Sequence, residues 1–142
     1  MILSFNVNTF YIGNNGAFDR IAKSCIRELK KDFPYIQLNT VLAYLPTCKQ
    51  KLDLKDTLFP ENLEFVPPKF AIIRRNFWMA EHSDYAIVYI HANGGAARAA
   101  EYADKIGVKI INISQFETRK YFDYKNSIDL SNIVNDLNNV KK

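Results

Sequence analysis

The sequence DYAIVYIHANGGAARAAEYA, residues 84–103, carries the strongest structural signal in the chain. Residues 85–90 form an unbroken run of apolar side chains, mostly β-branched or aromatic, which predicts a strand buried on both faces of a sheet. A short turn with two glycines follows, and the alanine-rich segment 96–105 predicts a helix. A strand, a glycine turn and a helix in this order make half of a βαβ unit.

The turn of this unit is the predicted ligand site. The first N–H groups of a helix and the positive end of its dipole attract anions, and paired glycines let a ligand approach the backbone closely. An ordinary turn with a surface ion pair is the alternative interpretation. The residues expected to contact a ligand here are His91, Asn93, Gly94, Gly95, Ala96 and Arg98.

The rest of the chain alternates predicted strands with predicted helices. Strands are expected over residues 8–12, 36–45 and 108–113, and helices over residues 17–33, 68–82 and from residue 127 onward. This alternation predicts an α/β fold of three layers, a mainly parallel sheet with helices on both faces, in a single domain over residues 1–142. Ligands of such sheets bind at the carboxyl ends of the strands. The turn after the first strand therefore joins the predicted ligand site, with Gly13, Asn14, Asn15 and Gly16.

Charge and composition limit the partners. The chain has 142 residues, 48% of them hydrophobic, and a net charge of +4, which suits an anionic small molecule. The basic residues are scattered along the sequence and no helix is expected to gather them into a stripe, so the sequence does not favour a nucleic-acid partner. Cys25 and Cys48 lack metal-ligand spacing, and neither a metal nor another cofactor is expected.

The sequence predicts neither a membrane span nor a signal peptide. No apolar run approaches the roughly 20 residues of a span, and the first residues lack a basic segment and a cleavage site. We therefore expect a cytoplasmic protein without a membrane partner. Aromatic residues near the C-terminus, among them Phe116 and Tyr121, leave a homodimer open.

Five blocks of the sequence resemble one protein family. They are FYIGNNGAFDRIA (10–22), VLAYLP (41–46), FPENLEFVPPKFAIIRRNFWM (59–79), SDYAIVYI (83–90) and NGGAARAAEYA (93–103). Together they resemble the SLOG superfamily, the Rossmann-like group that unites the DNA-processing Smf proteins with the LOG nucleotide phosphoribohydrolases. The likeness is greatest to small bacterial and phage members and covers about residues 8–113. It implies a Rossmann-like fold and a nucleotide ligand.

The resemblance also implies roles for individual residues. LOG enzymes cleave the N-glycosidic bond of nucleoside monophosphates with a glutamate that follows paired glycines. Glu101 matches this glutamate, and Gly94 and Gly95 match the glycines. Arg74 or Arg75 lies where the family carries a basic pair. Both arginines lie off the apolar stripe that is expected for their helix.

The sequence departs from the family pattern in two places. Ala97 and Arg98 replace the Gly-Thr pair that grips phosphate in relatives. The strand and helix that usually come first are also missing, with only residues 1–8 in their place. Because that unit helps line the nucleotide pocket in relatives, we expect the pocket to be open on this side or to be filled by residues 1–5 or by another subunit.

Four functions remain open from the sequence. The leading hypothesis is binding of a nucleotide or nucleotide-derived ligand, with its phosphate at the glycine turn near Arg74 or Arg75 and Arg98. The alternatives are an N-glycosidic hydrolase or transferase with Glu101 as the catalytic carboxylate, a sensor or sponge for a nucleotide signal, and an interaction protein that has lost the pocket. For Glu101, the structural alternative is a solvated carboxylate paired with Arg98 or Lys105.

Overall fold

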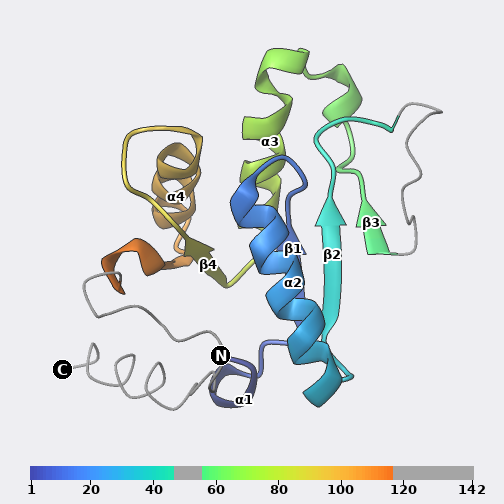
Figure 1. Cartoon of the computed structure of the whole chain (residues 1–142). Coiled ribbons are helices and arrows are strands. Elements are labelled where there is room, and N and C mark those ends of the chain that lie inside the picture. Colours follow the sequence, from blue (N-terminus) through green and yellow to red (C-terminus); the bar gives the residue numbers. More distant parts are fainter. Residues whose placement is uncertain (47–55, 117–142) are drawn as a thin grey trace.

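The computed structural model describes residues 1–46 and 56–116 (Figure 1). Predictions that fall on residues 47–55 and 117–142, among them the helix expected from residue 127, lie outside this part. No helix of the described part is long and apolar enough to cross a membrane. The elements follow one another as α1 (Ile2–Phe5), β1 (Thr9–Ile12), α2 (Ala17–Asp32), β2 (Gln37–Val41), β3 (Thr57–Leu58), the 3₁₀ helix η2 (Leu63–Phe65), α3 (Pro68–Glu81), β4 (Tyr85–Val88), α4 (Gly95–Lys105), β5 (Lys109–Asn112) and the 3₁₀ helix η3 (Ile113–Phe116).

The strands form two small parallel sheets among the described residues. β1, β2 and β3 make one sheet in the order β1-β2-β3, with Phe10 opposite Leu38. β4 and β5 make the other, with Ala86 opposite Ile110. The predicted α/β class with parallel strands is confirmed. The strand pairing in the described residues gives two sheets and not the one sheet that was expected.

The first sheet packs one of its faces against α2, which crosses in front of β1 and β2 in Figure 1. The buried residues of this cluster are Ile12, Ile26, Ile36 and Leu38. Phe10 packs against them, and because successive side chains of a strand point to opposite faces, Tyr11 points away from the cluster. The Tyr11 ring meets Trp78 of α3 edge to face, with ring centroids 5.6 Å apart. The helices α2 and α3 therefore contact side chains on opposite faces of β1.

The second sheet packs against α4. Its small core consists of Ala80 from α3, Ala103 from α4 and Val108, with Ala86 and Ile110 packed against them. Alanine at the helix positions lets α3, α4 and the strands approach closely. The second sheet thus has its own apolar cluster, separate from the cluster under α2.

The other face of β4 is only partly covered. Tyr85 contacts the Phe5 ring at 5.4 Å and Tyr89 contacts the Phe18 ring at 6.4 Å, while Ile87 between them is 43% exposed. The prediction that residues 85–90 are buried on both faces is therefore wrong. The reason is that α4 packs on the opposite face, and in the described part this face meets aromatic rings at the two ends of the strand.

Local sequence signals explain where α3 begins and where α4 ends. The helix α3 starts at Pro68, because proline suits the first turn of a helix. The helix α4 ends at Lys105, shortly before Gly107, whose φ of 86° lies in the left-handed region that glycine adopts most easily. Gly107 thus marks the end of α4, whose start carries the predicted ligand site.

Candidate functional site

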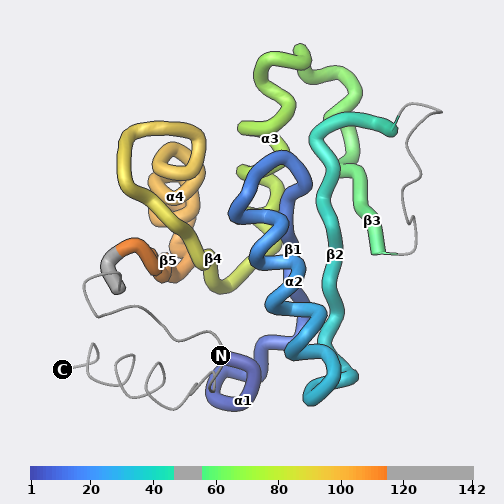
Figure 2. Tube along the Cα trace, viewed as in Figure 1, coloured from blue at the N-terminus to red at the C-terminus, as the bar shows by residue number. Residues whose placement is uncertain are grey.

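Two glycine turns lie at the carboxyl edge of the strands. The 13–16 turn joins β1 to α2, and the 89–94 turn joins β4 to α4. Phe18 in the first turn of α2 and Tyr89 directly after β4 stack with ring centroids 6.4 Å apart and an interplanar angle of 15°. This contact brings the two turns to the same edge, the upper one in Figure 2. The carboxyl edge is where parallel sheets bind their ligands.

Asp19 and Arg75 hold the 13–16 turn. One carboxylate oxygen of Asp19 accepts hydrogen bonds from the N–H groups of Asn15 at 3.0 Å and Gly16 at 3.1 Å. Arg75 is only 2% exposed. It donates from Nη1 to the carbonyl of Val41 at 2.8 Å and from Nη2 to the side-chain oxygen of Asn15 at 3.3 Å. The guanidinium therefore ties the turn to the end of β2.

The Arg75 guanidinium places a buried positive charge at this edge. Its Nε atom has no hydrogen-bond partner among the described residues. Burial lowers the pKa of Arg75, and the nearby Asp19 and Tyr44 groups act in the opposite direction. Arginine stays protonated in proteins, and a buried charge is tolerated when an opposite charge is near. Asp19 supplies that charge.

Gly13 is required by the packing of Arg75. A Cβ atom at position 13 would overlap the Nη1 atom of Arg75 and would lie 2.6 Å from Oδ2 of Asp19. A side chain at position 13 would therefore displace the ends of the Arg75 and Asp19 side chains. The structure thus brings together five of the predicted site residues, Gly13, Asn14, Asn15, Gly16 and Arg75.

The start of α4 is open in the described structure. Gly94 precedes the helix with an extended backbone, no side chain caps the first amides, and the first turn has no acidic residue. A Cβ atom at Gly94 or Gly95 would meet no atom within 4 Å. Asn93 and Ala96 are exposed beside them. This start differs from that of α2, where an acidic side chain already accepts hydrogen bonds from the turn.

His91 precedes this helix start in the sequence and Arg98 follows it. Arg98 is exposed in the first turn of α4 and has no carboxylate partner within the residues that the structure describes. The His91 ring packs edge to face against Tyr89, with centroids 4.4 Å apart. Since Tyr89 also stacks on Phe18, the three rings form an aromatic group between the two turns.

Phe18, Asp19 and Tyr89 belong to this edge but are not among the predicted ligand contacts. Their positions carry a signal that could have selected them. Phe18 and Tyr89 are aromatic residues directly beside a glycine turn. For Asp19 the sequence does predict a role, a cap at the start of its own helix, and its hydrogen bonds from the Asn15 and Gly16 N–H groups confirm it.

Glu101 is not directed toward the glycine turn. Its carboxylate accepts a hydrogen bond from Lys105 at 2.9 Å, and both side chains are 68% exposed. Glu101 lies six residues, or about 9 Å, along the helix from Gly95, and its partner lies one turn farther on. The hydrogen bond and charge of Lys105 lower the pKa of Glu101. The solvated ion pair, the structural alternative for this residue, is the arrangement observed.

Arg74 is held at the contact between α3 and α4. Its Nη1 atom donates to the Glu81 carboxylate at 2.9 Å, and the Tyr102 hydroxyl donates to the same oxygen at 2.6 Å. The Tyr102 ring also stacks on Phe77 at 4.0 Å. The structure therefore brings Arg75, and not Arg74, to a glycine turn.

The pKa of Glu81 offers a test of this contact. Burial raises the pKa of Glu81, but hydrogen bonds from Tyr102 and Arg74 outweigh burial and hold it below its usual range. A Tyr102→Phe variant loses the hydroxyl donor and is expected to raise the Glu81 pKa, measured by NMR titration of the side-chain carboxyl carbon. Glu101 is an internal control, because Lys105 sets its pKa. An unchanged Glu81 pKa would contradict the hydrogen bond.

The same shifts set the pH range in which this contact stabilises the fold. Folding lowers the pKa of Glu81, so the ionised carboxylate adds to the free energy of unfolding. This stabilisation is present above the usual pKa of a glutamate and is lost as the pH falls through the lowered value. The hydrogen bond to Glu81 raises the pKa of Tyr102. The stabilisation of the fold by the protonated Tyr102 hydroxyl is therefore present below the usual pKa of tyrosine and is lost as the pH rises through the raised value.

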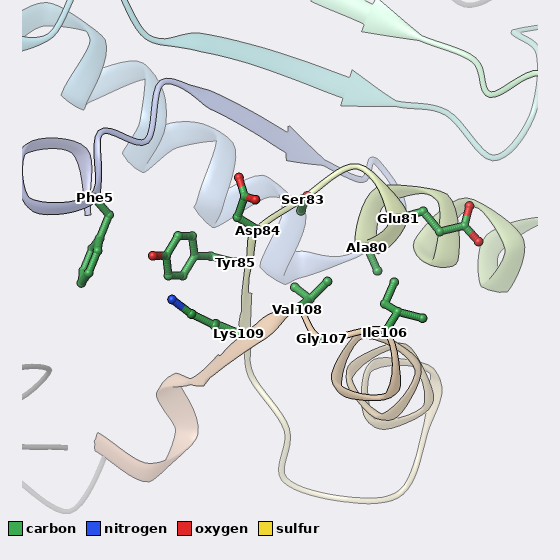
Figure 3. Close-up of a pocket in the computed structure, with 10 residues that line it drawn as sticks. All are labelled: Phe5, Ala80, Glu81, Ser83, Asp84, Tyr85, Ile106, Gly107, Val108 and Lys109. Carbon is green, nitrogen blue, oxygen red and sulfur yellow. The ribbon is translucent and has the colours of Figure 1, made fainter. Parts of the chain in front are cut away.

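An open cavity of about 480 Å³ lies at the opposite edge of the second sheet (Figure 3). It is bounded by Tyr85 and Lys109, the first residues of β4 and β5, and by the ends of α3 and α4. The Lys109 amino group lies 5.2 Å from the centre of the Tyr85 ring, and the Glu81 carboxylate points away in Figure 3. None of the predicted site residues lines this cavity. Across residues 1–46 and 56–116, no group of His, Cys, Asp and Glu side chains could hold a metal ion.

The structure corrects the interpretation of the basic residues. Arg20, Lys23, Arg27 and Lys30 all lie on α2, at spacings of three, four and three residues. With 3.6 residues per turn they fall within about 80° of one another around the helix. The expectation that no helix gathers basic residues into a stripe is therefore wrong. Apolar and acidic residues separate these four along the sequence, but the helix returns them to one side.

Comparison of the chain with protein-family models, with curated proteins and with solved structures gives no match. The function of the carboxyl edge is therefore argued from the two glycine turns and from the chemistry of the residues around them.

Proposed function

We propose that the protein binds a nucleotide or nucleotide-derived ligand at the carboxyl edge, between the 13–16 turn and the 89–94 turn. The stacking of Phe18 on Tyr89 is the observation that carries this proposal. It brings together two glycine turns that each lead into a helix, an arrangement suited to phosphorylated ligands.

The proposal includes a Rossmann-like arrangement of three layers, of the SLOG type. Parallel pairing in both sheets supports it. A second support is that Phe10 and Tyr11 of β1 contact different helices, α2 and α3, on its two faces. In such an arrangement β1 and β4 would be neighbours, and the Phe18–Tyr89 contact lies where their carboxyl ends would meet.

The phosphate is proposed to bind at the start of α4. At the start of α2, the Asp19 carboxylate accepts the N–H groups of Asn15 and Gly16, and its negative charge would repel an anion. The start of α4 has neither a side-chain cap nor an acidic residue in its first turn. Arg98 lies in that turn and can add a charge-assisted hydrogen bond.

The base is proposed to bind against the aromatic group between the turns. Tyr89 and His91 belong to the turn that precedes α4, and Phe18 stacks on Tyr89 from the first turn of α2. Stacking of a base on an aromatic side chain is worth roughly 1–3 kcal/mol. Arg75 has a supporting role in this proposal, because it fixes the side chain of Asn15 and gives the edge a buried positive charge.

Binding is favoured over N-glycosidic cleavage by the position of Glu101. To act as nucleophile or as acid/base, the Glu101 carboxylate would have to reach the sugar, whereas Lys105 binds this carboxylate at 2.9 Å. The ion pair also directs the carboxylate away from the start of α4, where the sugar and phosphate are proposed to lie.

The proposal predicts nucleotide binding that depends on the start of α4. Titration calorimetry with a nucleoside monophosphate, a diphosphate and a cyclic nucleotide is expected to detect binding to the wild-type protein. An Arg98→Gln variant should bind about 10-fold more weakly or worse, because a hydrogen bond to a charged group contributes roughly 1.5–3 kcal/mol. A Gly95→Ala variant should also bind more weakly, while its thermal midpoint should not fall, since the added Cβ meets no protein atom within 4 Å.

The matched control is Lys105→Gln, which removes an exposed cation from the other end of α4 and should leave affinity unchanged. Wild-type affinity in both Arg98→Gln and Gly95→Ala, or no binding across the nucleotide panel, would overturn the proposal. Release of free base from a nucleoside monophosphate, abolished by Glu101→Gln, would support N-glycosidic cleavage instead.

A further inference from the structure

One side of α2 carries a continuous row of positive charge. This α2 basic row consists of Arg20, Lys23, Arg27 and Lys30. The first and last members are ten residues apart, which corresponds to about 15 Å along the helix. Three members are exposed, and Lys23 is half-buried because its amino group donates to the Thr40 hydroxyl of β2 at 3.0 Å.

The α2 basic row is not neutralised by neighbouring carboxylates. None of its members has an ion pair in the part of the chain that the structure describes. Lys31 differs, because it lies 2.7 Å from Glu28. A small hollow of about 60 Å³ beside the row is lined by Lys23, Arg27 and Lys30 together with Asp56. Asp56 forms no ion pair with them, so no carboxylate in the described part of the chain cancels the charge of the row.

The row is also separate from the proposed nucleotide site. The apolar side of α2, with Ile26 and Leu29, packs on the first sheet, and Phe18 points toward Tyr89. Arg20 comes two positions after Phe18, so the two side chains leave the helix about 160° apart. A partner of the row would therefore not occupy the glycine turns.

We infer that the α2 basic row binds the phosphate backbone of duplex nucleic acid. The backbone of a duplex is a dense line of negative charge, and the α2 basic row sets four cations over about 15 Å of helix against it. The exposed residues next to the row on α2 are Ser24 and Lys31, which have no ring. Single-strand binding uses aromatic rings on which bases stack, so the row suits a duplex better.

The inference predicts a steep dependence of affinity on salt. Fluorescence anisotropy with a labelled duplex of about 20 base pairs should give a slope of log affinity against log salt near −3.6 for four phosphate contacts, or a roughly 150-fold loss between 50 and 200 mM salt. The affinity of an Arg20→Gln/Arg27→Gln variant for the duplex should fall only about 12-fold over this salt range, because two phosphate contacts remain. Both substitutions are at exposed positions, and circular dichroism checks that the helix is kept.

The matched control is an Arg74→Gln/Lys105→Gln variant, which removes two exposed cations away from α2 that are each paired with a carboxylate. Its salt slope should equal that of the wild type. If the salt dependence became equally shallow in both double variants, the inference would be overturned. Tighter binding of the single strand than of the duplex would overturn it too. Binding of an acidic peptide in place of the duplex would overturn it as well. Arg98→Gln should leave the slope unchanged, so failure of the nucleotide proposal and failure of this inference are distinguishable.

Discussion

A Gly13→Ala variant is expected to unfold at a clearly lower urea concentration, with its free energy of unfolding reduced by about 3 kcal/mol. The added methyl group has no space, because it would overlap Nη1 of Arg75 and lie 2.6 Å from Oδ2 of Asp19. Moving the guanidinium aside would weaken its hydrogen bonds to Val41 and Asn15. Since domains are stable by only about 5–15 kcal/mol, the loss should be plain in a urea titration followed by circular dichroism.

Gly94→Ala is the matched control for this variant. A Cβ atom at position 94 meets nothing within 4 Å, so its unfolding midpoint should equal that of the wild type. A Gly13→Ala/Arg75→Ala double variant should lose less stability than the two single variants added together, because removal of the guanidinium makes room for the methyl group. A wild-type midpoint for Gly13→Ala would show that Arg75 does not occupy this space.

An Arg75→Met variant is the second large effect that we expect, with a loss of about 3 kcal/mol. Methionine retains much of the apolar length of the side chain but none of its donors. The carbonyl of Val41 and the side chain of Asn15 would lose their hydrogen bonds, and the Asp19 carboxylate would lose the nearby positive charge. The urea midpoint measures this loss, and the slope of the transition checks that the unfolding remains two-state.

Arg74→Met is the control for Arg75→Met, because it removes an exposed guanidinium from the neighbouring position of α3. The comparison tests whether the loss of stability depends on burial of the charge. The Arg74 side chain is 48% exposed and pairs with Glu81 at the surface, and exposed pairs are worth at most about 1 kcal/mol. We therefore expect a small change in the unfolding midpoint. Equal losses in Arg74→Met and Arg75→Met would contradict the assignment of Arg75 as the buried arginine.

Much of the fold follows from local sequence patterns. The helices expected over residues 17–33 and 68–82 are observed as Ala17–Asp32 and Pro68–Glu81, because helical periodicity and the proline signal depend on nearby residues alone. The pairing of strands depends on contacts between distant parts of the chain. The division into two sheets and the exposure of Ile87 could therefore not be predicted from the apolar run around it.

The site shows the same contrast between local and distant contacts. The ion pair of Glu101 with Lys105 follows from their spacing of four residues on one helix. The burial of Arg75 does not follow from its helix, where it lies off the expected apolar stripe. It depends on a turn and a strand end that come from other parts of the sequence. The nucleotide ligand, the homodimer and the cytoplasmic location stay predictions, since they concern molecules and surroundings outside the chain. The SLOG resemblance stays a prediction as well.

The glycines of the two turns are under different kinds of constraint, and this has a consequence for how the protein can diverge. A side chain at position 13 would compete with Arg75 for one space, so a larger residue at the first position should be less costly after a smaller one has arisen at the second. Gly94 and Gly95 have no such partner within 4 Å in the described part of the chain. Packing alone would therefore allow both of them to be replaced without loss of the fold, whereas Gly13 is constrained by the fold itself.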